Sequence, residues 1–490
     1  MWKRKTLGLT LAAMLAGSQF AYAAEEKTGN AGTQVTAGYQ YSLQVEEDGT
    51  VWSFGSPVRN RYSSSPQIGR LPGGSLQHIV QVSAGFAHSA AVDDEGRVWA
   101  WGDNEKGQLG QWNTVPYDAA VSVILGDGEP VKAVAVAAGY DHTLALTGKG
   151  KVWAWGSNRY GELGDGTELD RGKPVQVMNG ERPLDDIVAV SAGFGTSLAL
   201  NREGEVWTWG SQGKADGAIG KVMTSKGNER VPLKNIVAIA AGYDHSLALD
   251  KSGKLYVWGV NRYGQLGLGS KTPYSMVATM LPGVPAFKAI AAGDQASAAV
   301  DEKGDIWVWG VGISGTDTNL SGESIRFVPE RITDGGHFTS VSVGRIHGLA
   351  VDDEKRIWIW GKNENGRLGQ GYEGYTTSKP IHKNPLKRTY ASPSSSSVTV
   401  EEAISDKQEL ILRLNLQLKD YEGKSLSDKW PTAEIRLPGR DPIVAPLLWG
   451  AHRKEGYQTE LRIPSPYYLV PQKIEIRVDG AIVAEVMSGK

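Results

Sequence analysis

Two glycines recur together seven times along the chain, and within each copy they are always 17 residues apart. The first follows an apolar run, and the second closes an aromatic run such as Val-Trp-Ala-Trp-Gly. The first glycines are Gly38, Gly85, Gly139, Gly193, Gly242, Gly293 and Gly344, and the second are Gly55, Gly102, Gly156, Gly210, Gly259, Gly310 and Gly361. The step between copies varies from 47 to 54 residues. A unit of fixed internal length, joined by loops of variable length at a period of about 50 residues, indicates a solenoid or a propeller.

Each copy is expected to contain four short antiparallel strands. In the fourth copy the fixed part predicts strands at residues 188–192, 198–200 and 206–209, with a glycine-containing turn at 201–204. Glycine supplies a positive φ in such turns at low cost. The variable part adds a further extended segment, for example at residues 174–178.

Twelve of the 16 tryptophans lie in the aromatic run that ends at the second glycine. Where two occur, they stand at i and i+2 and therefore share one face of their strand. Large flat side chains on one face suit sheets that stack face to face around an axis, and each buried aromatic contributes about 1.5–3 kcal/mol. We interpret these tryptophans as core and predict an all-β chain with a seven-bladed β-propeller over residues 35–385.

The runs Gly-Tyr-Asp-His-Ser-Leu-Ala-Leu at 242–249 and Val-Trp-Gly-Val-Asn-Arg-Tyr-Gly-Gln-Leu-Gly at 257–267 resemble the regulator of chromosome condensation repeat family. The resemblance covers about 70% of the chain. It implies a seven-bladed propeller, as in the known members. For function it implies less, because the family includes nuclear guanine-nucleotide exchange factors, parts of ubiquitin ligases and secreted bacterial inhibitors of β-lactamases.

Residues 1–23 have the features of a secretory signal peptide: a charged start, a short apolar centre and Ala21-Tyr22-Ala23 as a small-x-small cleavage site. An uncleaved anchor is the alternative, but the apolar stretch is short for a bilayer span. We therefore expect an exported bacterial protein, secreted or at the cell surface, with no membrane span in the mature chain. The absence of cysteine excludes disulfides and a lipoprotein-type thioether anchor.

The repeat pattern stops before the C-terminal region. Residues 386–397 have the Ser/Pro composition of a linker, and residues 398–490 alternate apolar and polar residues in six or so predicted strands. We predict a small C-terminal β-sandwich, immunoglobulin-like. Trp449, Tyr467 and Tyr468 are candidates for a partner contact there, although packing in the core or rim is the preferred interpretation.

Charge and motifs disfavour several classes of function. The formal net charge is −2, and about −5 once Lys3, Arg4 and Lys5 are removed with the leader, and no basic stripe appears, so we expect no nucleic-acid partner. The sequence lacks a Gly-x-Ser-x-Gly elbow, a phosphate-binding glycine loop and a His-Glu-x-x-His motif. We expect no cofactor, no metal and no enzyme activity. Carboxylates gathered in a propeller funnel leave a polysaccharide hydrolase or lyase as the alternative.

Four of the seven copies carry a histidine three residues after the first glycine, and the same four carry the loop Asn-x-x-Gly-x-Leu-Gly. The histidines are His88, His142, His245 and His347, and the asparagines are Asn104, Asn158, Asn261 and Asn363. We hypothesise a structural role, in which each histidine hydrogen-bonds the loop of its own or a neighbouring blade. A shared metal site is disfavoured because residues one blade apart do not converge.

Antiparallel alternation places the turn after the first strand and the loop after the third strand on one face of the propeller. Aromatic residues follow the first glycine in five copies, and Asp294 and Arg345 take this place in the other two. The predicted binding residues on this face are Tyr39, Phe86, Tyr140, Asp141, Arg159, Tyr160, Phe194, Tyr243, Asp244, Arg262 and Tyr263. A surface rich in tyrosine and arginine is typical of protein-binding hot spots, and packing of the rim is the alternative role.

Together these features predict a secreted or cell-surface module, monomeric, that binds a protein partner through one propeller face. Inhibition of an exported enzyme such as a β-lactamase is an alternative, because the exported inhibitors of the family are similar. A polysaccharide-acting enzyme is the second alternative. Guanine-nucleotide exchange rests on family analogy only, and the predicted leader disfavours it.

Overall fold

The computed structural model describes residues 33–55, 69–70, 76, 78–126, 132–213, 218–313, 325–363, 367–368, 376–383, 388–391, 397–405, 409–417, 432–436, 443–446, 448–449, 457–464, 472–478 and 481–488. The predicted leader (1–23), Tyr467 and Tyr468 lie outside these ranges. The chain divides into two compact units, the second made up chiefly of Pro380–Lys490. Within the described ranges, no helix is long and apolar enough to cross a bilayer.

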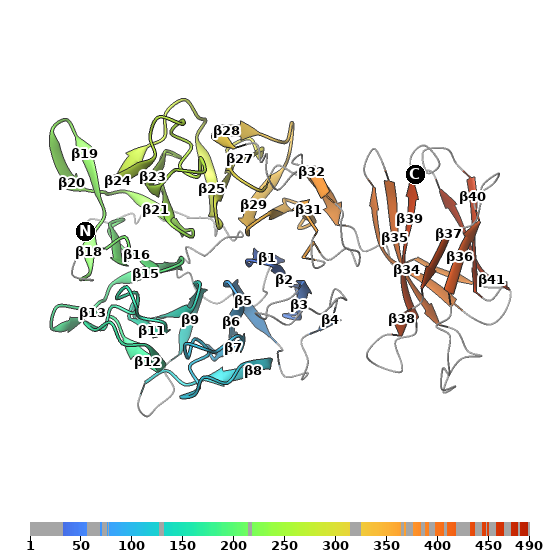
Figure 1. Ribbon diagram of the computed structural model, residues 1–490, viewed down its shortest axis with the longest axis horizontal. Helices are drawn as coiled ribbons and strands as arrows, with labels where there is room; N and C mark the ends of the chain where they lie inside the picture. The colour runs from blue at the N-terminus through green and yellow to red at the C-terminus, as the bar shows by residue number, and fades with distance from the viewer. Residues whose placement is uncertain are drawn as a thin grey trace, which may run out of the picture. The chain divides into compact units, whose positions relative to one another are not determined.

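The described part of the chain contains seven sheets of four antiparallel strands each, one of which is extended by a further hairpin, and this confirms the predicted all-β, seven-bladed β-propeller. In Figure 1 the sheets surround a common centre, with the first strand of each blade innermost. Blades 1 to 3 comprise β1 (Gln34–Ala37), β2 (Tyr41–Val45), β3 (Val51–Gly55), β4 (Gly69–Arg70); β5 (Ile79–Ala84), β6 (His88–Asp93), β7 (Val98–Gly102), β8 (Tyr117–Val123); and β9 (Ala133–Ala138), β10 (His142–Thr147), β11 (Val152–Gly156), β12 (Arg171–Gln176).

Blades 4 to 7 comprise β15 (Ile187–Ala192), β16 (Thr196–Asn201), β17 (Val206–Gly210), β18 (Gly220–Lys221); β21 (Ile236–Ala241), β22 (His245–Asp250), β23 (Leu255–Val260), β24 (Tyr274–Met280); β25 (Phe287–Ala292), β26 (Ala296–Asp301), β27 (Ile306–Gly310), β28 (Arg326–Arg331); and β29 (Phe338–Val343), β30 (His347–Asp352), β31 (Ile357–Lys362), β32 (Thr376–Lys383). A small hairpin, β13 (Met178–Asn179) and β14 (Arg182–Pro183), follows blade 3. A second hairpin, β19 (Met223–Lys226) and β20 (Glu229–Pro232), pairs with the outer strand of blade 5.

The two repeated glycines are required for different reasons. Gly139 lies where a Cβ would come within 2.6 Å of the Gly193 carbonyl oxygen of the next blade and within 2.6 Å of the His142 ring. Gly156 has φ +106° and pairs with His142 across the hairpin of β10 and β11. The spacing of 17 residues is constant because the two glycines belong to one three-stranded unit, in which the residue three positions after the first glycine pairs with the second glycine.

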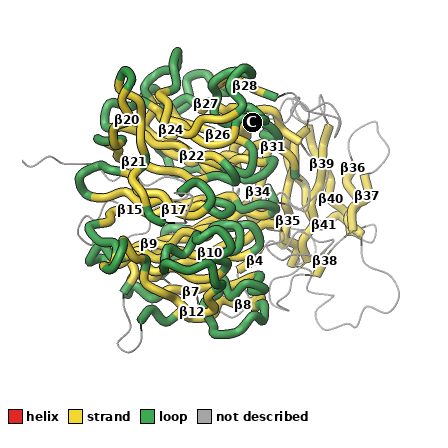
Figure 2. Tube along the Cα trace, turned by 60° about the vertical axis from the view of Figure 1, so that its left-hand side comes forward, coloured by secondary structure: helices red, strands yellow, loops and turns green. Residues whose placement is uncertain are grey.

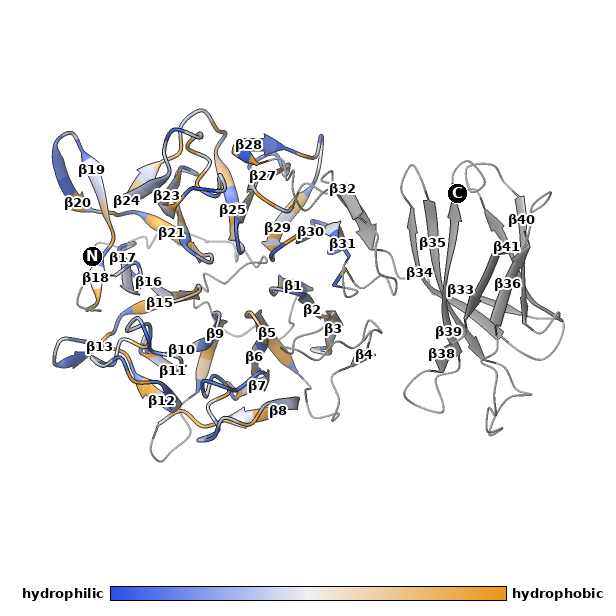
Figure 3. Ribbon diagram, viewed as in Figure 1, coloured by the Kyte–Doolittle hydropathy of each residue, from blue (hydrophilic) through white to orange (hydrophobic). Residues whose placement is uncertain are grey.

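In six of the seven copies a tryptophan directly precedes the second glycine, and it packs between blades. Trp155 of blade 3 is fully buried among Leu109, Val123 and Val136, so it joins the blade 2 core to that of blade 3. Trp209, Trp309 and Trp101 lie equivalently in the clusters around them. Figure 3 shows apolar inner strands such as β5 and β9 and hydrophilic outer elements such as β20 and β28.

Within the described residues, the ring closes between blades 7 and 1 without exchange of a strand. The sheet of blade 1 contains β1 to β4, and the sheet of blade 7 contains β29 to β32. Side-chain hydrogen bonds join the two blades: the Ala37 N–H donates to Ser342 Oγ at 2.9 Å, and Lys355 Nζ donates to Glu47 Oε1 at 2.7 Å. Strand β1 is therefore a member of blade 1 and does not complete the last blade.

The second unit contains two antiparallel sheets among its described residues. One has the order β33 (Arg388–Ala391), β34 (Ser397–Ser405), β35 (Glu409–Gln417), β39 (Tyr457–Pro464), β38 (Leu448–Trp449), and the other β37 (Ile443–Pro446), β36 (Thr432–Arg436), β40 (Gln472–Val478), β41 (Ala481–Ser488). Packing of these sheets face to face, which a sandwich requires, remains a prediction. Strand β33 lies in the stretch predicted as a linker, and 392–396 are outside the described ranges.

Candidate functional site

The residues that follow the seven first glycines form one ring around the propeller axis, which we call the hub ring. Its members are Tyr39, Phe86, Tyr140, Phe194, Tyr243, Asp294 and Arg345. Six of their backbone N–H groups donate to the first glycine of the next blade, as from Tyr140 to the Gly193 carbonyl at 2.9 Å. The glycines thus bring the blades together at the centre and fix the origin of each hub side chain.

Five aromatic side chains of the hub ring contact one another in sequence: two of the four pairs are stacked, one is tilted and one is edge-to-face. Their ring centroids are 4.2 Å apart for Tyr39 and Phe86, 3.9 Å for Phe86 and Tyr140, 4.6 Å for Tyr140 and Phe194, and 4.3 Å for Phe194 and Tyr243. Tyr140 and Tyr243 are only 6.0 Å apart although they come from non-adjacent blades. The aromatic side chains therefore fold over the central opening, where the cavity beneath them measures about 70 Å³.

Asp294 and Arg345 complete the hub ring with charge. Arg345 Nε lies 3.8 Å from Asp294 Oδ2, and its guanidinium carbon lies 4.9 Å from the centroid of the Tyr39 ring. Burial raises the pKa of Asp294 to about 6, Arg345 opposes this shift, and the nearby Asp244 adds to it. The molecule thus holds one of its own guanidinium groups between an aromatic ring and a carboxylate.

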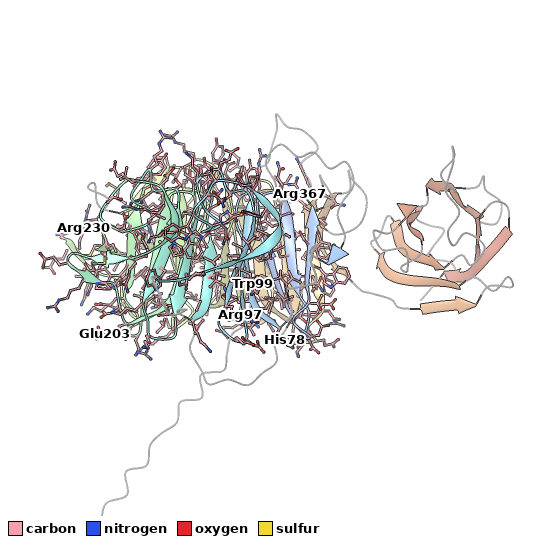
Figure 4. All side chains as sticks on the ribbon, turned by 90° about the horizontal axis from the view of Figure 1, so that it is seen from below. His78, Arg97, Trp99, Glu203, Arg230 and Arg367 are labelled. Carbon is pink, nitrogen blue, oxygen red and sulfur yellow. The ribbon has the colours of Figure 1, made fainter. Side chains whose placement is uncertain are left out.

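The loops that follow the third strands reach the same face as the hub ring, which we call the loop face. In Figure 4 the propeller is seen edge-on: Arg367, from the blade 7 loop, lies at one edge, and Arg97, Glu203 and His78 lie at the opposite one. The opposite face carries the turns between second and third strands, and we call it the turn face. Figure 2 shows the strands passing between the two sets of loops.

Each of the four histidines reaches its loop through a hydroxyl of the next blade. His245 Nε2 lies 2.8 Å from Ser297 Oγ, and Ser297 Oγ donates to the Gln265 carbonyl at 2.8 Å. The corresponding sets are His88, Thr143 and Gln108; His142, Ser197 and Glu162; and His347, Ser42 and Arg367. The direct bond from histidine to the Asn-x-x-Gly loop that we expected is replaced by a relay that joins two blades and one loop.

The relay fixes the charge and tautomer of the histidines. Since Ser297 uses its only proton on the Gln265 carbonyl, His245 Nε2 must carry the hydrogen and donate it to Ser297. Nδ1 is then unprotonated and faces Gly242. Desolvation lowers the pKa of His142 and His245 to about 3, and it holds that of His347 well below the ordinary value. These imidazoles stay neutral, which suits a structural role.

The asparagine of each Asn-x-x-Gly-x-Leu-Gly loop holds the loop together. In blade 5 the Asn261 Oδ1 accepts the Leu266 N–H at 2.8 Å, and Nδ2 donates to the Thr272 carbonyl at 2.6 Å. Asn104, Asn158 and Asn363 accept the equivalent leucine N–H at 2.9 Å. The asparagines are buried and form the loops rather than meeting a ligand.

The same loop carbonyl also accepts an indole N–H from the next blade. Trp155, Trp209 and Trp309 donate to Gln108, Glu162 and Gln265 at 2.8 Å. The indole N–H groups of Trp101, Trp258 and Trp360 are buried without an acceptor among the described residues, and each faces a blade that lacks the loop. This explains why histidine and loop occur together: the loop supplies the acceptor on which the hydroxyl and the indole both depend.

A second and larger cavity, of about 680 Å³, opens beside the hub ring between the loops of blades 2 and 3, and we call it the side cavity. Its volume falls within the range of ordinary ligand pockets, about 300–1,000 Å³, whereas the central cavity falls far below it. The lining residues are Lys106, Tyr140, Asp141, Ser157, Arg159, Tyr160, Glu162, Glu168, Leu169, Asp170, Phe194 and Tyr243.

Charge in the side cavity is predominantly acidic, with four carboxylates against two cations. Lys106 Nζ lies 3.5 Å from Asp170 Oδ2, so this pair is neutralised. The guanidinium of Arg159 lies over the Tyr160 ring, 5.6 Å from its centroid. Burial raises the pKa of Glu162, although Ser157 Oγ and the Tyr160 N–H both donate to its carboxylate. No group of three or more metal-ligating side chains occurs in the described part of the chain.

The structure gathers the eleven predicted binding residues on the loop face. Five belong to the hub ring, and Asp141, Arg159 and Tyr160 line the side cavity. Asp244 accepts from Gln265 Nε2 at 2.9 Å, while burial raises its pKa and nearby Arg262 opposes this rise. Arg262 and Tyr263 are exposed on the blade 5 loop.

Sequence reasoning missed the bridging hydroxyls and the side cavity. A serine or threonine stands four residues after the first glycine in six of the seven copies, and only Gly348 departs from this. That periodicity was a usable signal for the relay. The side cavity had no such signal, because its walls come from the loops of blades 2 and 3 together with hub residues of blades 4 and 5.

Comparison with known proteins gives a consistent result. A family model described as the RCC1-like domain matches residues 57–399. The chain is 30% identical over 274 residues to the ultraviolet-B receptor UVR8 of Arabidopsis thaliana, covering 54% of this chain and 49% of that receptor. It is 28% identical over 271 residues to the human E3 ubiquitin-protein ligase HERC2, covering 54% of this chain and 4% of the ligase.

Solved structures show the same fold. Prp20p from Saccharomyces cerevisiae superimposes with a TM-score of 0.54 at 24% identity, over 66% of this chain and 83% of that one. Human WBSCR16 gives a TM-score of 0.55 at 22% identity, over 68% and 92% of the two chains. At these identities the likeness concerns the fold. The chain spans about half of the length of the plant receptor and a small fraction of the ligase.

Proposed function

Because the chain belongs to the RCC1-like domain family, we propose that it is a protein-binding module without catalysis of its own, which docks its partner on the loop face. Prp20p is described by its binding to Gsp1p and histones, so a propeller of this family is suited to protein partners. The predicted leader adds the proposal that the protein works outside the cytoplasm, secreted or at the cell surface.

The observation that carries the proposal is the exposure of aromatic side chains on the loops that follow the third strands of blades 2, 3 and 5. Trp112 is 73% exposed, Tyr160 37% and Tyr263 41%. Trp112 has φ +63°, a left-handed conformation that is rare for a bulky residue, and its N–H donates to the Gly172 carbonyl at 2.8 Å. Large aromatic side chains that are held rigidly and left in water are typical of binding hot spots.

The partial burial of the hub aromatics is compatible with both packing and recognition. Phe86, Tyr140, Phe194 and Tyr243 are all half-buried: they stack on each other and still keep part of their surface in water. Stacking at the hub makes this surface rigid, and a rigid surface loses less entropy when a partner binds. The two roles are therefore compatible.

The experiment is a capture of partners by the full chain from its native source, with paired variants. Tyr160→Ala combined with Tyr263→Ala should abolish capture of the specific partner, because both side chains lie exposed on the loop face. Glu203→Ala combined with Lys251→Ala changes two exposed residues of the turn face and should leave it intact. Loss of capture by the turn-face variant alone would refute the assignment of the face.

The remaining alternatives are assayed on the same material. Inhibition of a β-lactamase by the purified chain would identify that enzyme as the partner, and it would support the proposed binding function. Accelerated nucleotide release from a GTPase would instead favour exchange. Turnover of a polysaccharide would overturn the non-catalytic proposal.

A further inference from the structure

Blade 2 carries a tryptophan where the other three Asn-x-x-Gly-x-Leu-Gly loops carry glycine. Eight residues after the loop asparagine, blade 2 has Trp112, whereas blades 3, 5 and 7 have Gly166, Gly269 and Gly371. The backbone at Gly166 and Gly269 is left-handed, with φ of +80° and +82°, and Trp112 keeps this conformation with φ +63°. Trp112 therefore occupies a position whose backbone favours glycine.

The fold gains little from the indole of Trp112. The residue is 73% exposed, and its closest charged neighbour, Lys173, places Nζ 4.4 Å from the ring centroid. A left-handed conformation costs free energy at a bulky residue, and an exposed indole recovers little of that cost through burial. A ligand that covers the indole would supply the reason for a tryptophan at this place.

Trp112 lies beside the side cavity. Its N–H donates to the Gly172 carbonyl, two residues after Asp170, and Lys106 of the same blade 2 loop pairs with Asp170. Both Lys106 and Asp170 line the side cavity. The inner wall of the cavity is aromatic and half-buried, and it consists of Tyr140, Phe194 and Tyr243. The indole and this aromatic wall thus belong to one part of the loop face.

Two carboxylates of the side cavity are engaged within the chain. Glu162 Oε1 accepts a hydrogen bond from Ser157 Oγ at 2.8 Å, and Oε2 accepts the Tyr160 N–H at 2.7 Å. Asp170 Oδ1 accepts the Asn158 N–H at 2.8 Å, in addition to its ion pair. A peptide N–H brought into the cavity would have to compete for these acceptors, and a buried donor left without one is costly.

Three other groups of the cavity are open and can donate hydrogen bonds. The hydroxyls of Tyr160 and Tyr243 and the guanidinium of Arg159 form no hydrogen bond to a described residue. Glu168 is exposed at the rim, where water hydrates it. The excess of carboxylates in the lining repels an anion. The cavity therefore suits an uncharged ligand that offers acceptors and apolar rings.

We propose that the side cavity and Trp112 bind a proline-rich segment of the protein partner in the polyproline II conformation. Proline lacks an N–H and keeps its carbonyl acceptor, so it meets the open donors and makes no demand on the engaged carboxylates. Its rings pack on aromatic side chains, and the preformed helix loses little entropy on binding. This deepens the proposed function and rests on it, because it names the chemistry that the partner presents.

The test uses the full chain and three fluorescein-labelled decapeptides: decaproline, a Gly-Ser repeat and decaglutamate. The Gly-Ser repeat keeps the carbonyls but adds N–H groups and lacks rings, and decaglutamate represents an anionic ligand. Fluorescence anisotropy should show decaproline binding at least about tenfold tighter than either of the others. Equal binding of decaproline and the Gly-Ser repeat, or tighter binding of decaglutamate, would overturn the proposal.

Trp112→Gly gives blade 2 the residue of the equivalent loops. The urea midpoint should stay nearly unchanged, because relief of the left-handed strain offsets the added freedom of glycine in the unfolded chain. Binding of decaproline should weaken at least about tenfold, since an exposed aromatic anchor is lost. A Trp112→Gly chain that unfolds at the same urea concentration and binds decaproline as before would refute the assignment.

Tyr160→Phe and Tyr263→Phe form a matched pair, because the two tyrosines are equivalent in blades 3 and 5 and only Tyr160 lines the cavity. Tyr160→Phe removes one hydroxyl donor and should weaken decaproline binding by about two- to tenfold, the size of one hydrogen bond. Tyr263→Phe should change it less than about twofold. Equal effects of the two substitutions would contradict the proposed site.

Failure of this proposal is distinguishable from failure of the proposed function. If the chain with Tyr160→Ala and Tyr263→Ala loses its native partner while the parent chain does not bind decaproline, the loop face is a docking surface and the proline-rich ligand is wrong. If that double variant retains the partner, the docking surface itself is wrong.

Discussion

Replacing Ser297 by alanine tests the relay that joins histidine, hydroxyl and loop. Ser297 Oγ receives a hydrogen bond from His245 Nε2 at 2.8 Å and donates to the Gln265 carbonyl at 2.8 Å. Ser297 and His245 are fully buried, so water cannot replace the lost hydroxyl. The substitution removes two hydrogen bonds and only one oxygen atom.

The cost follows from what each partner loses. His245 Nε2–H is left buried without an acceptor, which costs about 1–3 kcal/mol. The Gln265 carbonyl keeps the indole N–H of Trp309 at 2.8 Å, so its share is about 1 kcal/mol. We predict that Ser297→Ala lowers the free energy of unfolding by about 2–4 kcal/mol.

Ser246→Ala is the matched control, because Ser246 occupies the same strand position in blade 5 and faces blade 4, which has Thr196 in place of the histidine. Its hydroxyl makes one hydrogen bond, to Gln212 Oε1 at 2.8 Å, and its removal should cost about 1 kcal/mol. Urea unfolding followed by tryptophan fluorescence gives both values, provided that the m-value is unchanged. If Ser297→Ala costs no more than Ser246→Ala, the relay does not contribute to stability.

Three other outcomes are expected. The pKa of His142 and His245 is about 3 in the folded chain, well below the unfolded value of about 6.5. The free energy of unfolding should therefore be highest above pH 6.5 and fall as the pH is lowered. Urea unfolding at pH 7 and pH 5 should differ by about 2 kcal/mol for each histidine. Burial raises the pKa of Asp294 to about 6, so its ionisation at pH 7 destabilises the folded chain. Asp294→Asn should therefore increase the free energy of unfolding by at most about 3 kcal/mol at pH 7 and leave it unchanged at pH 4. Gly139→Ala should lower the free energy of unfolding by about 3 kcal/mol in urea unfolding, because its Cβ would meet the Gly193 carbonyl oxygen and the His142 ring; Gly148→Ala should have little effect, because its Cβ would meet only Val134 Cγ1, at 3.4 Å.

The propeller could be predicted from the sequence because its determinants repeat. The first glycine of each pair allows the close approach of blades at the hub, as at Gly139, and the second has a positive φ at the end of the third strand, as at Gly156. The tryptophans next to the second glycine pack between blades, and their burial agrees with the interpretation as core. The tryptophans two residues earlier are half-buried, so for them the interpretation holds only in part.

The relay could be predicted only in part, because its members lie in different copies. The co-occurrence of His245 with the Asn261 loop signalled a shared role, but the connecting group, Ser297, belongs to the next blade. Within one copy the histidine and the loop carbonyl do not meet. The side cavity was not predictable, since Tyr160 and Glu162 had to be brought against Phe194 of another blade.

Hydrogen exchange of the full chain, with and without its captured partner, tests the central claim most directly. A partner docked on the loop face should slow amide exchange in the loops at 157–170 and 261–267 and leave the turns at 94–97 and 202–204 unchanged. Protection confined to those turns, with the loops exchanging as in the free chain, would contradict the assignment of the loop face as the binding surface.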